Sequence, residues 1–220
     1  MPRVIGFYGH RAGLPHRFFS NFYVHTVPYC YRLPPFVLQE GFPSEVMCEF
    51  SEKAIMLTKA ALMKDRASFE KICKASTPAS CKALGRKVRN FDAKLWDSYL
   101  HETAFEVVKQ KFAADNVLKQ ELLSTGDDII AEATSNDSIW GIGINLGDPR
   151  VQDPKQWQGR NVLGQALMDA RDFLRKVDET SGVSADGDTV SHDRQPVEVL
   201  DVIDCENNPP RKRCKVQRAS

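Results

Sequence analysis

The sequence predicts an α+β fold that is predominantly helical, with short N-terminal strands or a hairpin followed by one multihelical domain. Two observations carry this prediction. Aromatic residues and prolines crowd residues 1–50, which favours strands and turns over helices. From residue 52 to about residue 124, long stretches lack helix breakers and carry apolar residues at helical spacing.

Short strands are expected before residue 51. Val46, Cys48 and Phe50 alternate with the residues between them, as in a strand with one buried face. Ser51 follows directly, and serine is a preferred N-cap residue. We therefore expect Ser51 to cap a helix that begins near Glu52.

Helices are expected over residues 52–63, 65–74, 79–89, 92–114 and 116–123. Thr77 and Pro78 mark the start of the third helix, because threonine caps a helix and proline fits its first position. A short strand is expected at residues 129–131. A loop rich in glycine, proline, aspartate and asparagine then spans residues 141–159, before a last amphipathic helix that ends near Lys176.

The composition is close to that of soluble globular proteins, with 30 Lys and Arg, 29 Asp and Glu, and 42% hydrophobic residues. It argues against a collagenous chain, a fully disordered chain and a strongly basic nucleic-acid coat. The charges are unevenly spread, because residues 1–176 carry an excess of bases and the following segment is first acidic and then basic. We predict one folded domain over residues 1–176 and a disordered charged tail over residues 177–220.

The sequence gives no sign of a membrane segment or a secretion signal, because no stretch approaches the roughly 18–20 apolar residues of a bilayer span. An intracellular protein, nuclear or cytoplasmic, is expected. The six cysteines include no C-x-x-C pair, so neither a metal site nor a disulfide framework is expected.

Familiar catalytic motifs are absent, including the phosphate-binding loop, H-E-x-x-H and the G-x-S-x-G nucleophile elbow, and no cofactor is expected. Glu52, Met56 and Lys59 have the spacing of one helix face. If that face lines a cleft, a carboxylate and an ammonium both point into it. Otherwise it is a solvated face with ordinary charges.

Two glycine-containing segments are further candidates. In the first, Trp140 and Gly141 suit a ligand that stacks on the indole and approaches the backbone; the alternative is a turn begun by Asp137, with the indole in the core. In the second, Asn161 and Gly164 open the last helix, where Asn161 either caps the helix or contacts a ligand.

Two residues between these candidates carry weaker signals. Arg86 is either a surface charge or a phosphate contact. Trp96, near the start of a long helix, is either a core residue or a platform for a ligand.

Taken in order, the short motifs of residues 5–176 resemble the NADAR family, which is named for a link to NAD and ADP-ribose. The matching segments are Gly9-His10, Phe19–Tyr23, Ser51-Glu52, Lys59-Ala60, Gly85-Arg86, Trp96, Lys111-Phe112, Leu122–Gly126, Glu132, Asp137–Gly143 and Gly159–Gly164. The chain departs from the family pattern in two places: residues 11–18 form an insertion, and Met56 stands where the family often has glutamine.

The resemblance implies an enzyme that cleaves the N-glycosidic bond between a ribose and a nitrogen base. The favoured substrate is ADP-ribose attached to guanine in nucleic acid, whose removal restores the base. One alternative substrate is a phosphorylated ribosylamino-pyrimidine intermediate of riboflavin synthesis. A second alternative is a non-catalytic ADP-ribose binding module. No metal is required.

The resemblance also suggests roles for individual residues. Glu52 would stabilise positive charge on the ribose and orient water, and Asp137 would position ribose hydroxyls or protonate the base. Lys59 would hold a phosphate or hydroxyl, or attack the opened sugar as a Schiff-base nucleophile. The implied substrate-binding residues are Ser20, Asn21, Phe22, Arg86, Trp96, Trp140, Gly141, Asn161 and Gly164.

The tail contains two short patterns of its own. Val197–Ile203 is an apolar run with interleaved acids that resembles a SUMO-interacting motif, which adds a strand to a partner's sheet. Pro210–Lys215 resembles a nuclear-localisation signal.

Overall fold

A computed structural model describes residues 2–37 and 41–182, which belong to one compact unit. The SUMO-interacting pattern, the nuclear-localisation pattern and most of the predicted tail lie outside the described residues. No helix in the described ranges is long and apolar enough to cross a membrane.

Two short strand pairs frame the fold. Strand β2 (Tyr29–Arg32) pairs antiparallel with β3 (Glu45–Cys48), which is the strand predicted from the alternation around Val46. Strand β1 (Val4–Phe7) pairs in parallel with β4 (Ile129–Glu132), so Phe7 lies opposite Glu132. The second pair joins segments that are distant in the sequence.

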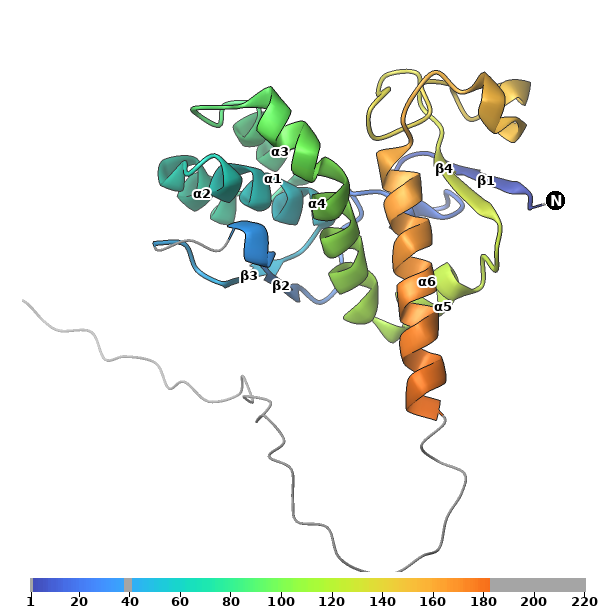
Figure 1. The fold of residues 1–220 in the computed structure, drawn as a ribbon, viewed down its shortest axis with the longest axis horizontal. Helices are drawn as coiled ribbons and strands as arrows, with labels where there is room; N and C mark the ends of the chain where they lie inside the picture. Colours follow the sequence, from blue (N-terminus) through green and yellow to red (C-terminus); the bar gives the residue numbers. More distant parts are fainter. Residues whose placement is uncertain (1, 38–40, 183–220) are drawn as a thin grey trace, which may run out of the picture. The chain divides into compact units, whose positions relative to one another are not determined.

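Helices make up about half of the described chain and strands a small part of it, and the predicted α+β, mainly helical fold class is confirmed. They are α1 (Ser51–Leu62), α2 (Arg66–Cys73), α3 (Pro78–Gly85), α4 (Ala93–Ala113), α5 (Asn116–Leu123) and α6 (Val162–Gly182). Figure 1 shows α1, α2 and α3 gathered with β2 and β3 on one side of α4, while α6 and the β1–β4 pair lie on the other.

Two large hydrophobic cores follow from this arrangement. The first surrounds α1 and includes Tyr31, Phe50 and Leu57, and the second lies between α4 and α6 and includes Phe112 and Leu167. A pair of half-buried tryptophans, Trp96 and Trp140, packs against both cores. The seam between the cores is therefore lined by the two aromatic residues that the sequence singles out as ligand platforms.

Local sequence signals explain the helix starts, with one correction. Thr77 Oγ1 accepts a hydrogen bond from the Ser80 amide at 3.2 Å, so the predicted cap of α3 is confirmed. The prediction that Ser51 caps α1 is wrong. Extended Phe50 is the N-cap residue and makes no side-chain cap, and Ser51 is the first residue of the helix.

Two helix ends also differ from expectation. Helix α3 stops at Gly85 because the amide and guanidinium of Arg89 both donate to the buried carboxylate of Asp65, which draws the chain out of the helix. Helix α6 continues past Lys176 to Gly182, and the ammonium of Lys119 on α5 pairs with the carboxylate of Asp178 in this extension.

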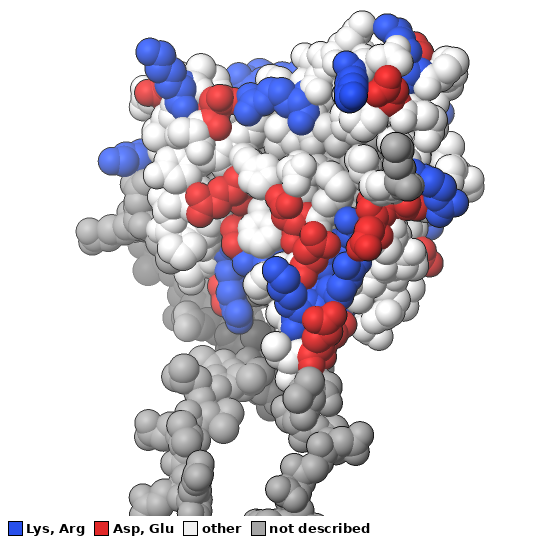
Figure 2. All heavy atoms as spheres, turned by 45° about the vertical axis from the view of Figure 1, so that its right-hand side comes forward, with Lys and Arg blue, Asp and Glu red and all other residues white. Residues whose placement is uncertain are grey.

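Charged side chains of both signs are mixed on the face shown in Figure 2. Elsewhere in the described structure, charged side chains form pairs, such as Arg175 with Asp127 at 3.0 Å and His101 with Asp169 at 3.0 Å. The modest basic excess of residues 1–176 is therefore not gathered into one patch on this face.

Candidate active site

A cavity of about 270 Å³ opens beside the seam between the two cores. Its lining is Ser20, Asn21, Phe22, Glu52, Met56, Lys59, Lys82, Gly85, Arg86, Trp96, Glu132, Asp137, Ile139 and Trp140. All three predicted catalytic residues belong to this lining. Six of the predicted binding residues belong to it as well: Ser20, Asn21, Phe22, Arg86, Trp96 and Trp140.

Helix α1 supplies the floor of the cavity. Glu52, Met56 and Lys59 all line it, so the face that they share looks into a cleft rather than into solvent. The Glu52 amide donates a 2.9 Å hydrogen bond to the Asn21 carbonyl, which joins the first turn of α1 to the loop before it. A Cβ atom added at Gly85 would lie 1.8 Å from Met56 Sδ, so glycine lets α3 approach α1 closely.

The loop that supplies Ser20, Asn21 and Phe22 is held from below by a buried lysine. Lys111 on α4 donates hydrogen bonds to the carbonyl oxygens of Phe18 and, at 3.2 Å, of Ser20. Burial without an acidic partner disfavours its charge and lowers the pKa of Lys111 to about 7. The Lys111-Phe112 motif of the sequence thus supports one wall of the cavity.

Aromatic rings surround the ammonium of Lys59. Its nitrogen lies 4.1 Å from the ring centroid of Phe91 and 5.7 Å from that of Trp96. Such contacts favour the cation, while partial burial lowers the pKa of Lys59 and the nearby Glu52 raises it. The Lys59 side chain therefore lines the cavity with its ammonium against aromatic rings.

Opposing influences act on the carboxyl group of Glu52. Burial raises the pKa of Glu52 to about 7, and Asp137 adds to the rise. Lys82, Arg86 and Lys59 act in the opposite direction by attracting the carboxylate. A carboxyl poised near neutrality in a cleft is typical of a catalytic group.

A second buried carboxyl, Glu132, enters the cavity from the end of β4. Its pKa is raised to about 7 by burial, with further contributions from Asp137 and Glu52, while Lys82 lowers it. Its backbone is fixed on both sides, because its amide donates to Asn161 Oδ1 at 3.1 Å and its carbonyl accepts from the Ile142 amide at 2.9 Å.

Asp137 begins a turn, as one interpretation of its motif predicts. Its Oδ1 accepts hydrogen bonds from the amides of Ile139, at 3.0 Å, and Trp140, at 2.8 Å, as in an aspartate-initiated turn. The same residue and Trp140 also line the cavity. The turn therefore positions the indole of Trp140 both against the cores and at the cavity wall.

Three predicted substrate contacts, Gly141, Asn161 and Gly164, lie outside the cavity lining. The Asn161 side chain bonds the backbone of β4, accepting from Glu132 N and donating to Ile130 O at 2.8 Å. Added Cβ atoms at Gly141 and Gly164 would lie 2.6 Å from Glu132 O and 2.1 Å from Ile130 O. The Asn161 side chain therefore holds the start of α6 against β4 by hydrogen bonds. The two glycines leave space for the backbone of β4 to approach closely.

Comparison with known proteins identifies the family of the chain. The family model of the NADAR domain matches residues 6–175. The chain belongs to the NADAR family. The expectation drawn from the ordered motifs is thereby confirmed.

Several NADAR relatives bear the name N-glycosidase. One from Acanthamoeba polyphaga mimivirus is 35% identical over 140 residues, which cover 63% of this chain and 82% of the relative. Another, from Nostoc punctiforme, is 28% identical over 176 residues, covering 80% and 97% of the two chains. The NMR structure of the Escherichia coli protein YbiA shares the NADAR fold, with a TM-score of 0.60, 24% identity and coverage of 81% and 89%.

Two charged cavity residues of this NADAR domain, Lys82 and Glu132, are missing from the site predicted from the sequence. Lys82 lies one helical turn before Arg86, so its spacing signals a shared face. Glu132 ends an apolar strand, and a carboxyl at a strand end is a comparable signal. In the described residues, no cluster of three or more His, Cys, Asp or Glu side chains is placed to hold a metal ion.

Proposed function

We propose that this NADAR protein hydrolyses the bond between ribose C1 and a base nitrogen, and that it removes ADP-ribose from ADP-ribosylated guanine in nucleic acid. The observation that carries the proposal is one cavity that combines buried carboxyls, three cations and two tryptophans. The N-glycosidase names of relatives support the reaction class. The guanine substrate rests on the family resemblance and on the chemistry of the cavity.

The chemistry of the bond suits the carboxyls. Cleavage of C1–N builds oxocarbenium character on the ribose, and a nearby carboxylate stabilises this charge and orients the attacking water. Glu52 takes this role. Its place in the first turn of α1 and the cations Lys82 and Arg86 favour its ionised form.

The other groups of the cavity suit the rest of an ADP-ribose. Lys82 and Arg86, one turn apart, offer positive charge for a diphosphate. Trp96 and Trp140 offer flat walls for stacking. Lys59 holds a phosphate or ribose hydroxyl, or alternatively attacks the opened sugar aldehyde as an amine nucleophile.

Charge beside the cavity supports a polynucleotide substrate. Two exposed lysines adjoin cavity residues in the sequence. Lys87 follows the cavity residue Arg86, and Lys94 lies in the first turn of α4, two residues before the cavity residue Trp96. Phe91, between them in sequence, is 46% exposed and touches the cavity through Lys59. Exposed cations interleaved with an aromatic ring suit a phosphate backbone with unstacked bases.

A direct assay tests the proposal. The protein is mixed with an oligonucleotide carrying ADP-ribosylated guanine, and released ADP-ribose is measured by mass spectrometry. Release by wild type, with a large loss in Glu52→Gln, is the expected result. Binding without release would support an ADP-ribose reader instead. Turnover of a phosphorylated ribosylamino-pyrimidine alone would support the riboflavin-intermediate alternative.

The two tail patterns remain separate proposals about partners and location. We propose that Val197–Ile203 binds SUMO and that Pro210–Lys215 directs the protein to the nucleus. Deletion of residues 209–220 should abolish nuclear accumulation of a tagged chain, and an unchanged distribution would contradict the second proposal. Titration of the full chain with SUMO, with a Val202→Asp variant as control, tests the first.

A further inference from the structure

We propose that Glu132, at the end of β4, is the acid that donates a proton to the departing base, while Glu52 across the same cavity acts in its ionised form. The proposal rests on the N-glycosidase function proposed above. It assigns protonation of the leaving base to Glu132, and stabilisation of the ribose cation and activation of water to Glu52.

The position of Glu132 suits a proton donor. It lines the cavity together with Glu52 and Asp137. Pairing with Phe7 in β1 and the hydrogen bonds of its amide to Asn161 and of its carbonyl to Ile142 hold its backbone in place. A catalytic group on a strand braced in this way keeps its orientation when substrate binds.

The surrounding charges separate the two glutamates. Three cations, Lys82, Arg86 and Lys59, attract the Glu52 carboxylate. Among the described residues, Lys82 is the one cation that has a comparable effect on Glu132.

The nearby acids add to this separation. Glu132 is faced by the carboxyls of Glu52 and Asp137, and both disfavour a charge on it. Because burial already penalises two neighbouring charges, the pair favours the state with one proton. Glu52 has more cations around it than Glu132, and this difference favours the proton on Glu132.

Asp137 is less suited to the same task. Its Oδ1 already accepts two backbone hydrogen bonds, from the amides of Ile139 and Trp140. These bonds occupy Oδ1 as an acceptor and hold the side chain in its turn, which suits contact with ribose hydroxyls. The proton donor is therefore Glu132.

The resulting reaction is balanced. The C1–N bond breaks with its electron pair going to nitrogen, and nitrogen takes the proton of the Glu132 carboxyl. Water attacks C1 and gives a proton to the Glu52 carboxylate. The products are the unmodified guanine, still part of its nucleic acid, and ADP-ribose with a C1 hydroxyl. Proton exchange with solvent then returns Glu132 to its acid form and Glu52 to its carboxylate.

The pH dependence of turnover tests the assignment. For wild type acting on ADP-ribosylated guanosine, kcat/KM should fall on the alkaline side as Glu132 loses its proton, and on the acid side as Glu52 gains one. Glu132→Gln should lower kcat by roughly 10²–10⁴-fold with little change in KM, and its alkaline limb should disappear. Glu52→Gln should lose the acid limb instead.

Either of two results would overturn the proposal: wild-type kcat in Glu132→Gln, or a reduced kcat with the alkaline limb unchanged. Folding of each variant is checked by its amide NMR spectrum. A merely structural role for Glu132 would lower activity without changing the shape of the pH profile.

A second measurement does not depend on turnover. The side-chain carboxyl of Glu132 is followed by carbon-13 NMR in the full chain as the pH is changed. It should titrate near neutrality, and Glu52→Gln should shift the midpoint to lower pH because a neighbouring negative charge is removed. A midpoint near 4 would overturn the assignment. If wild type cleaves no N-riboside, the proposed function fails, whereas this titration still decides which glutamate carries the proton.

Discussion

The ammonium of Lys111 lies 3.2 Å from the carbonyl oxygen of Ser20, so a fully buried lysine on α4 holds the loop that forms one cavity wall. Its second hydrogen bond goes to the carbonyl of Phe18. The buried amine of Lys111 therefore stabilises the loop through two hydrogen bonds. Its burial also leads to a prediction about how stability depends on pH.

Lys111→Met should destabilise the fold, because each buried carbonyl left without its donor costs about 1–3 kcal/mol. The loss should grow from pH 7 to about pH 10. Since burial lowers the pKa of Lys111 to about 7, the folded chain releases a proton there that the unfolded chain keeps until about pH 10. Stability contributed by wild-type Lys111 therefore rises with pH across this window.

Urea unfolding of wild type and Lys111→Met at pH 6, 8 and 10 measures this difference. Shared titrating groups cancel in the comparison of the two proteins. A difference in unfolding free energy that stays constant over this range would show that the amine does not titrate in the folded chain.

Glu52→Gln should lower turnover by roughly 10²–10⁴-fold and yet stabilise the fold above neutral pH. Burial raises the pKa of Glu52 to about 7, so the folded chain keeps a proton that the unfolded chain releases near pH 4.5. Wild-type stability therefore falls as pH rises through this window, and the variant lacks this contribution. The thermal midpoints of the two proteins at pH 5 and pH 8 measure it.

Glu70→Gln on α2 is a matched control for that substitution, because Glu70 is exposed and pairs with Arg66 at 3.0 Å. Its turnover should equal that of wild type. Near-wild-type turnover in Glu52→Gln would remove Glu52 from the catalytic role.

Lys59→Met should reduce kcat/KM by roughly 10²-fold or more, because it removes the ammonium from the cavity beside Phe91 and Trp96. Lys59→Arg separates the two roles of the residue. Recovery by arginine indicates a binding cation. Failure to recover, together with a borohydride-trapped sugar adduct on Lys59, indicates an amine nucleophile. Unchanged activity in Lys59→Met would exclude both.

Charge reversal of Lys87 and Lys94 to glutamate should weaken action on an ADP-ribosylated oligonucleotide far more than on ADP-ribosylated guanosine. These exposed residues adjoin the cavity residues Arg86 and Trp96 in the sequence and would meet flanking phosphates. The slope of log KM against log salt should also become shallower, since fewer counterions are released.

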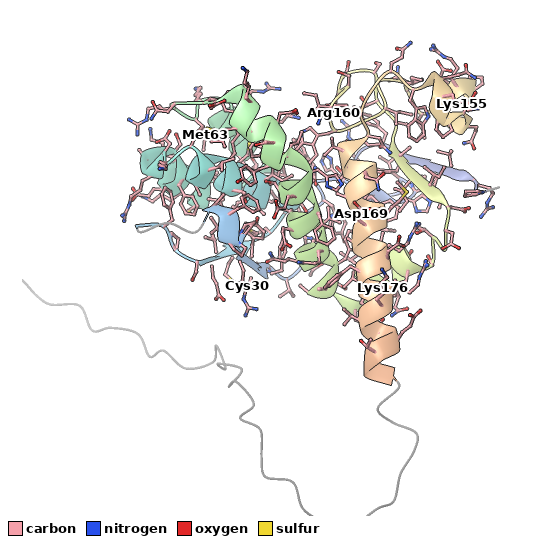
Figure 3. All side chains as sticks on the ribbon, in the orientation of Figure 1. Cys30, Met63, Lys155, Arg160, Asp169 and Lys176 are labelled. Carbon is pink, nitrogen blue, oxygen red and sulfur yellow. The ribbon has the colours of Figure 1, made fainter. Side chains whose placement is uncertain are left out.

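The matched control reverses Lys155 and Lys176, which Figure 3 labels on η4 (Pro154–Gln156) and α6, on the other side of α4 from α3. It changes the net charge by the same amount. Equal losses in the two double variants, or equal effects on the two substrates, would argue against a polynucleotide path over the α3–α4 connection.

The elements that the sequence predicts well are those with local causes. Thr77 and Pro78 start α3, and Asp92, whose carboxylate accepts from two amides of the first turn, starts α4. The boundary at Gly85 was missed because its cause, Asp65 holding Arg89, is a contact between distant residues. The parallel pairing of β1 with β4 has no local signal for the same reason.

The residues of the candidate site likewise separate into those with a local sequence signal and those placed by contacts between distant segments. Glu52 and Lys59 could be found together because helical spacing alone puts them on one face. Asn161 could not be assigned, since capping and ligand binding give the same sequence pattern, and its actual bonds go to β4. Lys82 and Glu132 reach the cavity only through the packing of α3 on α1 and of β4 beside α6.

Trp96 and Trp140 each pack against both hydrophobic cores and line the cavity between them. A molecule stacked on these indoles is therefore in contact with both halves of the domain. While it is bound, it adds packing contacts that link the two hydrophobic cores. Ligand binding should raise the temperature at which the two halves unfold together. The fluorescence of the two indoles then reports both ligand binding in the cavity and the joint unfolding of the two halves.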